Sequence, residues 1–260
     1  MLNIRAKKSL GQNFLKSILA LKEIVKAGEI LPTDIILEIG PGKGALTAKL
    51  LETGATVVAV EKDRDLFAFL SEKFKENIDN NKLILINDDI LELNMNEIIS
   101  LSANYKIIAN IPYNITGAIL KKFLTADAKQ GGQPKTMVLM VQNEVAKRII
   151  ARDNKESLLS VSIKAYGEPK MVMKVPARYF SPAPKVDSAV ISIKNISRKF
   201  FEDNNINEEK FWELVHAGFA HKRKQIGKSI KEFVSVEAHE KFKNKRAEDL
   251  SPSDWALLLK

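Results

Sequence analysis

The stretch Ile35-Ile36-Leu37-Glu38-Ile39-Gly40-Pro41-Gly42-Lys43-Gly44 decides the predicted fold. Its first five residues form a mostly apolar run of strand length, and the glycine-rich turn opens an amphipathic helix that runs to about Thr53. A second apolar run over residues 56–60 ends in Glu61. Two strands joined by a helix form a βαβ unit, whose strands are parallel and whose crossover is right-handed. The chain is therefore predicted to build an open α/β sheet.

The βαβ unit is extended on both sides by further strand and helix patterns. Two β-rich runs, over about 170–175 and 186–193, have no helix between them and are predicted to pair antiparallel at the edge of the sheet. The remaining strands are expected over 83–86, 107–110 and 136–141, and the helices over 17–31, 65–77, 114–126, 143–151 and 157–166.

The pattern changes at about residue 198, where strand signals stop and apolar residues recur at helical spacing. The group Ser251-Pro252-Ser253-Asp254 is typical of a helix start, with a capping serine, a proline at the first position and an acid that reaches back. We therefore predict two domains, a sheet domain over residues 1–197 and a small helical domain over residues 198–260.

The composition is that of a globular intracellular protein. The chain has 260 residues, is 45% hydrophobic and contains no cysteine, which excludes disulfides and thiolate metal sites. The three histidines have no metal-like spacing, so no metal site is predicted. Polar residues stand where a signal peptide needs an apolar core, and no apolar run approaches membrane-spanning length. We expect a monomer in the cytoplasm that does not associate with membranes.

The net charge of +9 is concentrated at the two ends of the chain. Residues 1–16 carry four Lys or Arg and no acid, and residues 221–246 carry nine against three acids. Residues 17–220 are nearly neutral, with 27 bases and 26 acids. Basic clusters of this kind indicate contact with a polyanion, and a solvated lysine-rich surface is the alternative.

The stretch Ile107-Ile108-Ala109-Asn110-Ile111-Pro112-Tyr113-Asn114 places an asparagine where a buried strand ends. Ligands bind beyond the carboxyl ends of the strands in open α/β sheets. The Asn110 carbonyl and a neighbouring backbone carbonyl can accept both hydrogens of an exocyclic amine, while the Tyr113 ring stacks on the base that carries it. A strand-ending turn with a buried tyrosine is the structural alternative.

Three acids lie at the carboxyl ends of successive strands of the predicted sheet, namely Glu38 just before the glycine turn, Glu61 after the second strand and Asp89 after the third. The glycine spacing in the turn differs from the G-x-G-x-x-G pattern of dinucleotide-binding enzymes, and Glu38 would repel a pyrophosphate. S-adenosylmethionine (SAM) has no phosphate and carries an ammonium and a sulfonium, so an acidic pocket suits it. Glu61 is placed to accept the ribose hydroxyls, and Asp89 can accept the adenine amino group. The acids favour SAM, and a dinucleotide oxidoreductase is the distant alternative.

The motifs in their order resemble those of the ribosomal RNA adenine N6-dimethyltransferases. They are Lys8–Leu15 (KSLGQNFL), Glu38–Gly42 (EIGPG), Asn110–Asn114 (NIPYN) and Phe180–Val190 (FSPAPKVDSAV). The tail Phe219–Lys224 is similar to that of the small-subunit branch, although its His221-Lys222 departs from the common pattern. The resemblance covers about residues 5–255 and implies a seven-stranded Rossmann-like SAM-dependent methyltransferase sheet with a small C-terminal helical domain.

The resemblance also implies roles for individual residues. Cofactor contacts would come from Asn13 and Leu15 in a basic segment over residues 1–16 that covers the cofactor, and from Gly40, Glu61, Asp89 and Asn110. Asn110 would stand between the cofactor and the target base, and Tyr113 and Phe180 would hold the target adenine between their rings. No metal is required.

The resemblance implies dimethylation of two adjacent adenosines in a hairpin near the 3′ end of small-subunit (16S) rRNA. The substrate would be a pre-assembled small ribosomal subunit, which the helical domain would contact, and the cellular context would be ribosome biogenesis. Two alternatives stay open: an Erm-type large-subunit (23S) rRNA adenine dimethyltransferase that confers antibiotic resistance, and an assembly factor that binds RNA without methylating it.

Overall fold

The computed structural model of the chain describes residues 6–7, 10–94, 105–127, 131–151, 153, 155–221 and 223–260. Parts of two predicted motifs, Lys8 with Ser9 and Lys222, lie outside the described residues, as do residues 1–5 of the basic N-terminal segment. The chain forms two compact units, the first with residues 1–146 and 170–196, and the second with residues 147–169 and 197–260.

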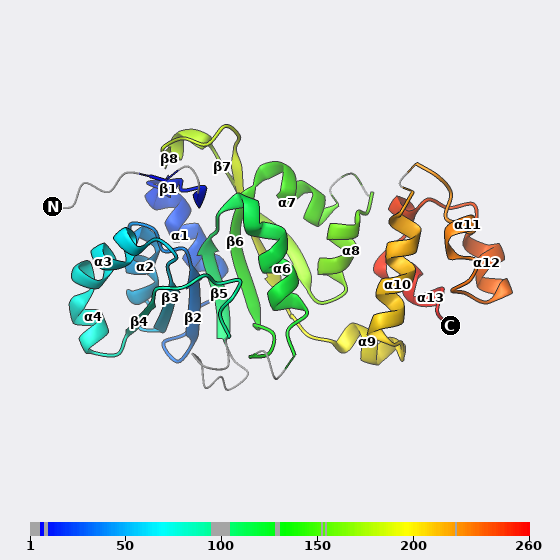
Figure 1. Ribbon diagram of the computed structural model, residues 1–260, viewed down its shortest axis with the longest axis horizontal. Coiled ribbons are helices and arrows are strands. Elements are labelled where there is room, and N and C mark those ends of the chain that lie inside the picture. The colour runs from blue at the N-terminus through cyan, green and yellow to red at the C-terminus, as the bar shows by residue number, and fades with distance from the viewer. Residues whose placement is uncertain are drawn as a thin grey trace. The chain divides into compact units, whose positions relative to one another are not determined.

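Within the described residues, the first unit contains a seven-stranded sheet, which confirms the predicted fold class (Figure 1). The strand order is β4 (Leu83–Ile86), β3 (Thr56–Val60), β2 (Ile35–Ile39), β5 (Tyr105–Asn110), β6 (Thr136–Gln142), β9 (Ser188–Lys194) and β7 (Glu168–Val175). The five strands from β4 to β6 are parallel, and β9 is antiparallel to β6. Along the chain, β3 and β4 are added on one side of β2, and β5 and β6 are then added on its other side. Such a reversal of strand order, here between β2 and β5, marks the position at which α/β sheets bind ligands.

The two β-rich runs predicted at the sheet edge lie side by side there as β9 and β7, with β7 outermost. The seven residues of β9 are buried except for Lys194, whereas most of β7 is exposed or half-buried. An inner strand covered on both faces is expected to be apolar throughout, and an edge strand is expected to carry polar residues. The position in the sheet therefore explains the difference in composition between the two strands.

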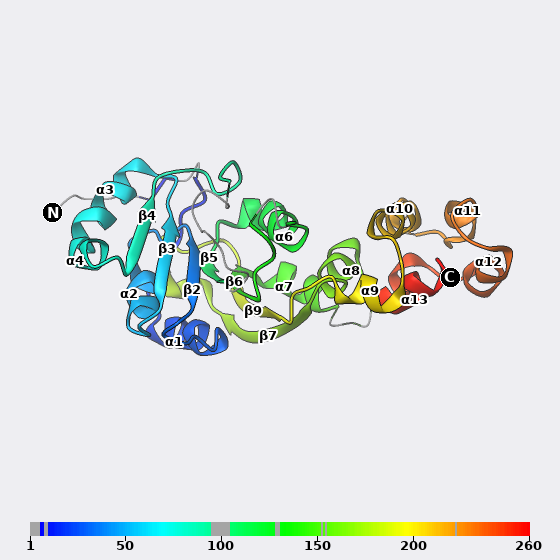
Figure 2. The same ribbon diagram turned by 90° about the horizontal axis from the view of Figure 1, so that it is seen from below.

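Helices cover both faces of the sheet (Figure 2). On one face lie α1 (Ile18–Ala27) and α2 (Ala45–Leu51), and on the other lies α6 (Thr116–Leu124). Each presents a buried apolar stripe, for example Ile119 and Phe123 one turn apart on α6. Because the strands between the helices are buried on both sides, their residues are almost all apolar.

The prediction of one continuous helix over residues 65–77 is wrong. The segment is divided at Phe74 into α3 (Arg64–Lys73) and α4 (Lys75–Asp79), because Phe74 has the non-helical angles φ −111° and ψ 24°. Its ring packs where Gly44 leaves space, since a Cβ added to Gly44 would lie 2.4 Å from Phe74 Cε2. Burial of the ring against the glycine turn thus interrupts a helical pattern. The first helix is also shorter than predicted, and α1 ends at Ala27 rather than at residue 31.

A two-stranded antiparallel sheet that the sequence did not predict joins β1 (Phe14–Leu15) to β8 (Phe180–Ser181). In its register, Phe14 pairs with Ser181 and Leu15 with Phe180. The N-terminal segment is therefore fixed beside the loop that carries the FSPAP motif (Figure 1). Strands of two residues carry no periodicity, so no sequence pattern announces them.

The second unit is helical in its described residues. It contains α8 (Leu158–Lys164), α9 (Lys199–Asn204), α10 (Glu208–Phe219), α11 (Gly227–Ile230), α12 (Val236–Phe242) and α13 (Pro252–Leu257), while α7 (Asn143–Ile150) crosses from the first unit into the second. The predicted start of the last helix is confirmed, because Ser251 caps α13 and Pro252 is its first residue. No helix in the described part of the chain is long and apolar enough to cross a membrane.

The predicted domain border after residue 197 did not anticipate that residues 147–169 group with the C-terminal helices. An aromatic cluster explains the grouping, since the Tyr166 ring stacks on Trp212 with centroids 6.0 Å apart. The Tyr166 hydroxyl also accepts a hydrogen bond from Trp212 Nε1 at 3.1 Å and donates to Glu208. Contacts between residues this far apart in sequence leave no local signal.

Candidate functional site

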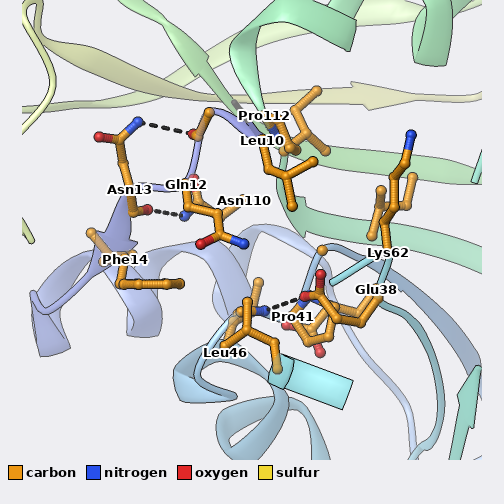
Figure 3. Close-up of a pocket in the computed structure, with 18 of the residues that line it drawn as sticks. Leu10, Gln12, Asn13, Phe14, Glu38, Pro41, Leu46, Lys62, Asn110 and Pro112 are labelled. Atoms are coloured by element: carbon orange, nitrogen blue, oxygen red, sulfur yellow. Dashed lines mark hydrogen bonds between the residues drawn. The ribbon is translucent and has the colours of Figure 1, made fainter. Parts of the chain in front are cut away.

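A cavity of about 440 Å³ opens at the carboxyl edge of the parallel strands, within the first unit. Its walls come from the glycine turn after β2, from Glu61 and Lys62 after β3, from the segment after β4 and from the end of β5. The N-terminal segment from Leu10 to Lys16 closes a further side. Figure 3 shows side chains from these segments around one cavity. Parallel strands bring their carboxyl ends to one edge, which explains why the segments meet.

The residues predicted to bind the cofactor all line this cavity: Asn13, Leu15, Gly40, Glu61, Asp89 and Asn110. Of the residues predicted to hold the base, Tyr113 lines it as well. The sequence did not single out Lys62 or Gln12, which also line the cavity. Lys62 follows the predicted site residue Glu61, and Gln12 precedes the predicted site residue Asn13. This adjacency is the one sequence signal that could have indicated them.

Glu61 is held by backbone donors from two directions. Gly42 N–H donates to Oε2 at 3.1 Å, and Asp63 N–H donates to Oε1 at 2.9 Å. Glu61 is 5% exposed, and this burial raises the pKa of its carboxyl above the ordinary value. A carboxylate has about four lone-pair positions, so two remain for hydroxyl donors. The orientation of the carboxylate is therefore set before any ligand binds.

Asp89 forms an ion pair that crosses the rim of the cavity. Lys62 Nζ lies 2.6 Å from Asp89 Oδ2, and Leu91 N–H donates to Oδ1 at 3.0 Å. The lysine holds the pKa of Asp89 below its usual value, so this carboxyl is ionised at neutral pH. Since Lys62 is the more exposed partner, the pair is weak and can exchange with a ligand amine.

Glu38 is the most deeply buried acid of the cavity. It lies on β2, is 1% exposed and has a carboxyl oxygen, Oε2, without a hydrogen-bond partner among the described residues. Burial raises its pKa to about 8, and the nearby Glu61 works in the same direction. A buried polar atom without a partner is costly, and such atoms mark places that a ligand or water completes.

Asn110 occupies the last position of β5 and faces the N-terminal segment (Figure 3). Its Nδ2 donates to the carbonyl oxygen of Asn13 at 3.3 Å, across 97 residues of sequence. Asn13 in turn donates from its own side chain to the Gly11 carbonyl at 3.1 Å. With its nitrogen directed at Asn13, the Asn110 amide offers Oδ1 as the atom that can accept from an amine.

Tyr113 and Phe180 differ in their access to the cavity. Tyr113 begins η2 (Tyr113–Ile115), is half-buried, and has its hydroxyl 2.5 Å from Ser188 Oγ. Phe180 is 2% exposed and belongs to the same core cluster as Leu15. The cavity is lined at this end by Ser181, the next residue of β8. The structure thus brings Tyr113, but not the Phe180 ring, to the wall of the cavity.

In the part of the chain that the structure describes, no group of three or more His, Cys, Asp or Glu could hold a metal ion. Of the three acids of the cavity, Glu61 accepts from backbone N–H groups and Asp89 from a backbone N–H group and a lysine, while Glu38 keeps an oxygen without a partner among the described residues. The chemistry that the cavity supports is therefore that of hydrogen-bond acceptors and carboxylates around a polar ligand.

Comparison with known proteins agrees with the motifs. The family model described as "Ribosomal RNA adenine dimethylase" matches residues 3–260. Proteins named ribosomal RNA small subunit methyltransferase A are similar in sequence. The one from a Dehalococcoides mccartyi strain is 37% identical over 98% of this chain and 88% of its own. The one from Prochlorococcus marinus is 39% identical over 98% of this chain and 90% of its own.

Two solved structures resemble the whole chain. A dimethyladenosine transferase from Plasmodium falciparum has a TM-score of 0.78 at 25% identity, covering 95% of this chain and 96% of its own. The 23S rRNA methyltransferase ErmE has the same TM-score and identity, covering 95% of this chain and 98% of its own. The fold is thus shared with a dimethyladenosine transferase and with a 23S rRNA methyltransferase. Because the family model spans nearly the full length and relatives are more than a third identical, the chain belongs to the ribosomal RNA adenine dimethylase family.

Proposed function

We propose that this methyltransferase uses SAM to dimethylate N6 of two adjacent adenosines in a hairpin near the 3′ end of small-subunit rRNA. The observation that carries the proposal is the position of Asn110 at the end of β5, on the wall of a cavity that also contains Glu38, Glu61 and Asp89. The names of the similar small-subunit enzymes support the choice of RNA.

The residues of the cavity fit SAM. Glu38 leaves a buried oxygen without a partner among the described residues, Glu61 has acceptor positions to spare, and Asp89 can exchange its exposed lysine for an amine. The ionised Asp89 and the acceptor oxygens of Glu38 and Glu61 suit a ligand with positive charge and no phosphate. Glu61 would hold the ribose, Asp89 the adenine, and Asn13, Leu15 and Gly40 the remainder. When bound, SAM supplies a methyl group activated by a sulfonium.

Asn110 acts on the amine that receives the methyl group. The N6 lone pair of adenine is delocalised into the ring, so the nitrogen is a poor nucleophile until it becomes more tetrahedral. The Asn110 Oδ1 and the backbone carbonyl of Ile111 or Pro112 would accept the two N–H groups and favour that geometry. Acceptors placed in this way stabilise the transition state more than the ground state. No strong base is needed, because the proton becomes acidic once the nitrogen is alkylated.

The adenine must leave its stack to reach Asn110, and aromatic faces offset this cost by about 1–3 kcal/mol each. Tyr113 supplies one face, with its ring orientation held by the hydroxyl contact to Ser188. Phe180 is the proposed second face. Its burial in the core requires the loop that begins at Ser181 to shift when RNA binds.

The charge distribution of the chain supports an RNA partner. Residues 221–246 in the proposed RNA-contacting helical domain carry nine Lys or Arg against three acids. Such residues bind phosphates without reading sequence, which makes affinity strongly dependent on salt. A folded hairpin would be recognised by its shape and an unpaired base. We propose a cytoplasmic monomer that acts on a pre-assembled small subunit.

One assay tests the proposal: radiolabelled SAM is offered to undermethylated small subunits and, separately, to protein-free large-subunit rRNA. Label in dimethyladenosine of the small subunit is the expected result. Label in the large-subunit RNA alone would instead identify the Erm-type activity, a candidate that the ErmE fold keeps open. RNA binding without label in either substrate would identify an assembly factor. The Asn110→Ala protein serves as the negative control.

A further inference from the structure

Asp63 is a buried carboxylate that the proposed reaction does not use. It follows β3 by three residues and is the N-cap of α3, where it accepts from Asp65 N–H at 3.0 Å. Its side chain is fully buried. Burying an ionised carboxylate is costly unless hydrogen-bond donors surround it. The donors to Asp63 therefore indicate its role in the structure.

Two of these donors, Lys7 and Gln12, come from the N-terminal segment, whose residues Leu10 to Lys16 line the cavity. Lys7 Nζ lies 2.6 Å from Asp63 Oδ1, and Gln12 Nε2 donates to Oδ2 at 2.8 Å. Lys7 N–H also donates to Gln12 Oε1 at 2.8 Å, so the two donors are joined to each other. Burial works to raise the pKa of Asp63, but the bonds from Lys7 and Gln12 outweigh it and hold the pKa below the usual value. The segment is therefore fastened to an ionised carboxylate.

The backbone of the same residue contacts the proposed ribose acceptor. Asp63 N–H donates to Glu61 Oε1 at 2.9 Å, and Gly42 N–H holds the other oxygen at 3.1 Å. The position of Asp63 therefore affects both the orientation of Glu61 and the attachment of the N-terminal segment. Asp63 thus contacts both the N-terminal segment and Glu61, the proposed ribose acceptor.

We infer that Asp63 is a positioning residue that couples closure of the N-terminal segment to cofactor binding through Glu61. The inference rests on the proposed function in that it takes Glu61 as a cofactor ligand. Because coupling between two events is reciprocal, a bound cofactor must also strengthen the attachment of the segment. Asp63 itself touches neither the cofactor nor the base in this role.

The test uses Asp63→Asn, because asparagine is as good an N-cap as aspartate and its one oxygen can still accept from Asp65 N–H, while the charge that pairs with Lys7 and the acceptor for Gln12 are lost. We expect the affinity for S-adenosylhomocysteine, measured by calorimetry, to fall about tenfold. We also expect the rate of tryptic cleavage within residues 7–16 to rise, and the ligand to protect these sites less than in the wild type. The matched control is Asp65→Asn, which alters a carboxylate that also pairs with Lys7 but is 71% exposed. It should change affinity by less than about twofold.

Lys7→Met repeats the test without touching the cap of α3, and it should weaken ligand binding to a similar extent. In the double variant with Asp63→Asn the losses should not add, because both changes break one contact. Unchanged affinity and protection in either single variant, with the melting temperature preserved, would overturn the inference. Failure of the wild type to bind the ligand would instead refute the proposed function.

Discussion

The proposed cofactor side and the proposed base side of the cavity are built differently. On the cofactor side, Glu61 and Asp89 are each fixed by a backbone N–H group within a few residues of a strand end. On the base side, Asn110 is held by one bond to Asn13, while the Phe180 ring is buried. Glu61 and Asp89 are therefore oriented before a ligand binds, whereas the Phe180 ring does not line the cavity. If the proposed roles hold, the difference predicts that cofactor binding is pre-organised, whereas base binding requires rearrangement.

Asn110→Ala should give the largest effect, since Asn110 lies where the two sides meet. Loss of an acceptor that acts in the transition state is expected to lower kcat by about 10²–10³-fold, or about 3–4 kcal/mol. The affinity for SAM should stay within several-fold, because the cofactor side keeps its own ligands. Single-turnover methylation and calorimetry measure the two quantities.

The matched control for this variant is Asn114→Ala, which removes a second asparagine that lines the cavity but lies beyond the strand end. It should retain most of the turnover. An equal loss of SAM affinity and turnover in Asn110→Ala would show that Asn110 mainly holds cofactor, and the comparison between the two sides would then fail.

Glu38→Gln tests how the buried carboxyl on the proposed cofactor side affects the stability of the fold. Burial raises the pKa of Glu38 to about 8 from an ordinary 4.5, so the folded chain keeps a proton that the unfolded chain has lost. This group therefore makes the free energy of unfolding fall as pH rises from about 4.5 to about 8. Between about pH 5 and pH 7, the free energy of unfolding should fall by about 2 kcal/mol less in the variant than in the wild type. Urea unfolding of the ligand-free protein at several pH values measures it.

Glu52→Gln is the control for the pH series, because Glu52 is 60% exposed and, among the residues that the structure describes, forms an ion pair with Lys49 at the surface. Its pH dependence should match the wild type. If Glu38→Gln also retained the full wild-type slope, the buried carboxyl would be ionised in the folded protein, and burial would not govern its protonation.

Glu61→Gln should weaken the cofactor side without affecting the base side. The amide keeps the shape of the carboxylate but directs an N–H₂ group at one of the two N–H donors, from Gly42 or Asp63. We expect the affinity for S-adenosylhomocysteine to fall about tenfold, with kcat at saturating SAM within about twofold. A lower kcat with unchanged affinity would move Glu61 from cofactor binding to catalysis.

Tyr113→Phe should give the smallest effect. It removes the hydroxyl contact to Ser188 but keeps the ring that is proposed to stack on the base. We expect kcat/KM for the RNA to change by less than about fivefold, since an ordinary hydrogen bond contributes about 1 kcal/mol. Tyr113→Leu, which has no ring, is the comparison and should lose several-fold more. Equal kinetics for the two variants would show that the ring does not stack.

Much of the fold could be predicted from local patterns. The strand over residues 56–60 was predicted with the observed bounds, because an apolar run with turns on both sides has one stable arrangement in an α/β sheet. The division of the helix at Phe74 could not be predicted, since it depends on the contact with Gly44. The grouping of residues 147–169 with the C-terminal helices depends in the same way on distant aromatic contacts.

The sequence by itself determined the family, the strands that carry the site, and the residues at their carboxyl ends that line the cavity. Parallel strands gather their ends at one edge, so a polar residue after an apolar run is placed by local pattern alone. The tertiary structure decided how these residues are held: the donors to Glu61, the fastening of the N-terminal segment at Asp63 and the burial of Phe180. Those contacts join residues far apart in the chain, and their energies depend on packing and burial that no local pattern encodes.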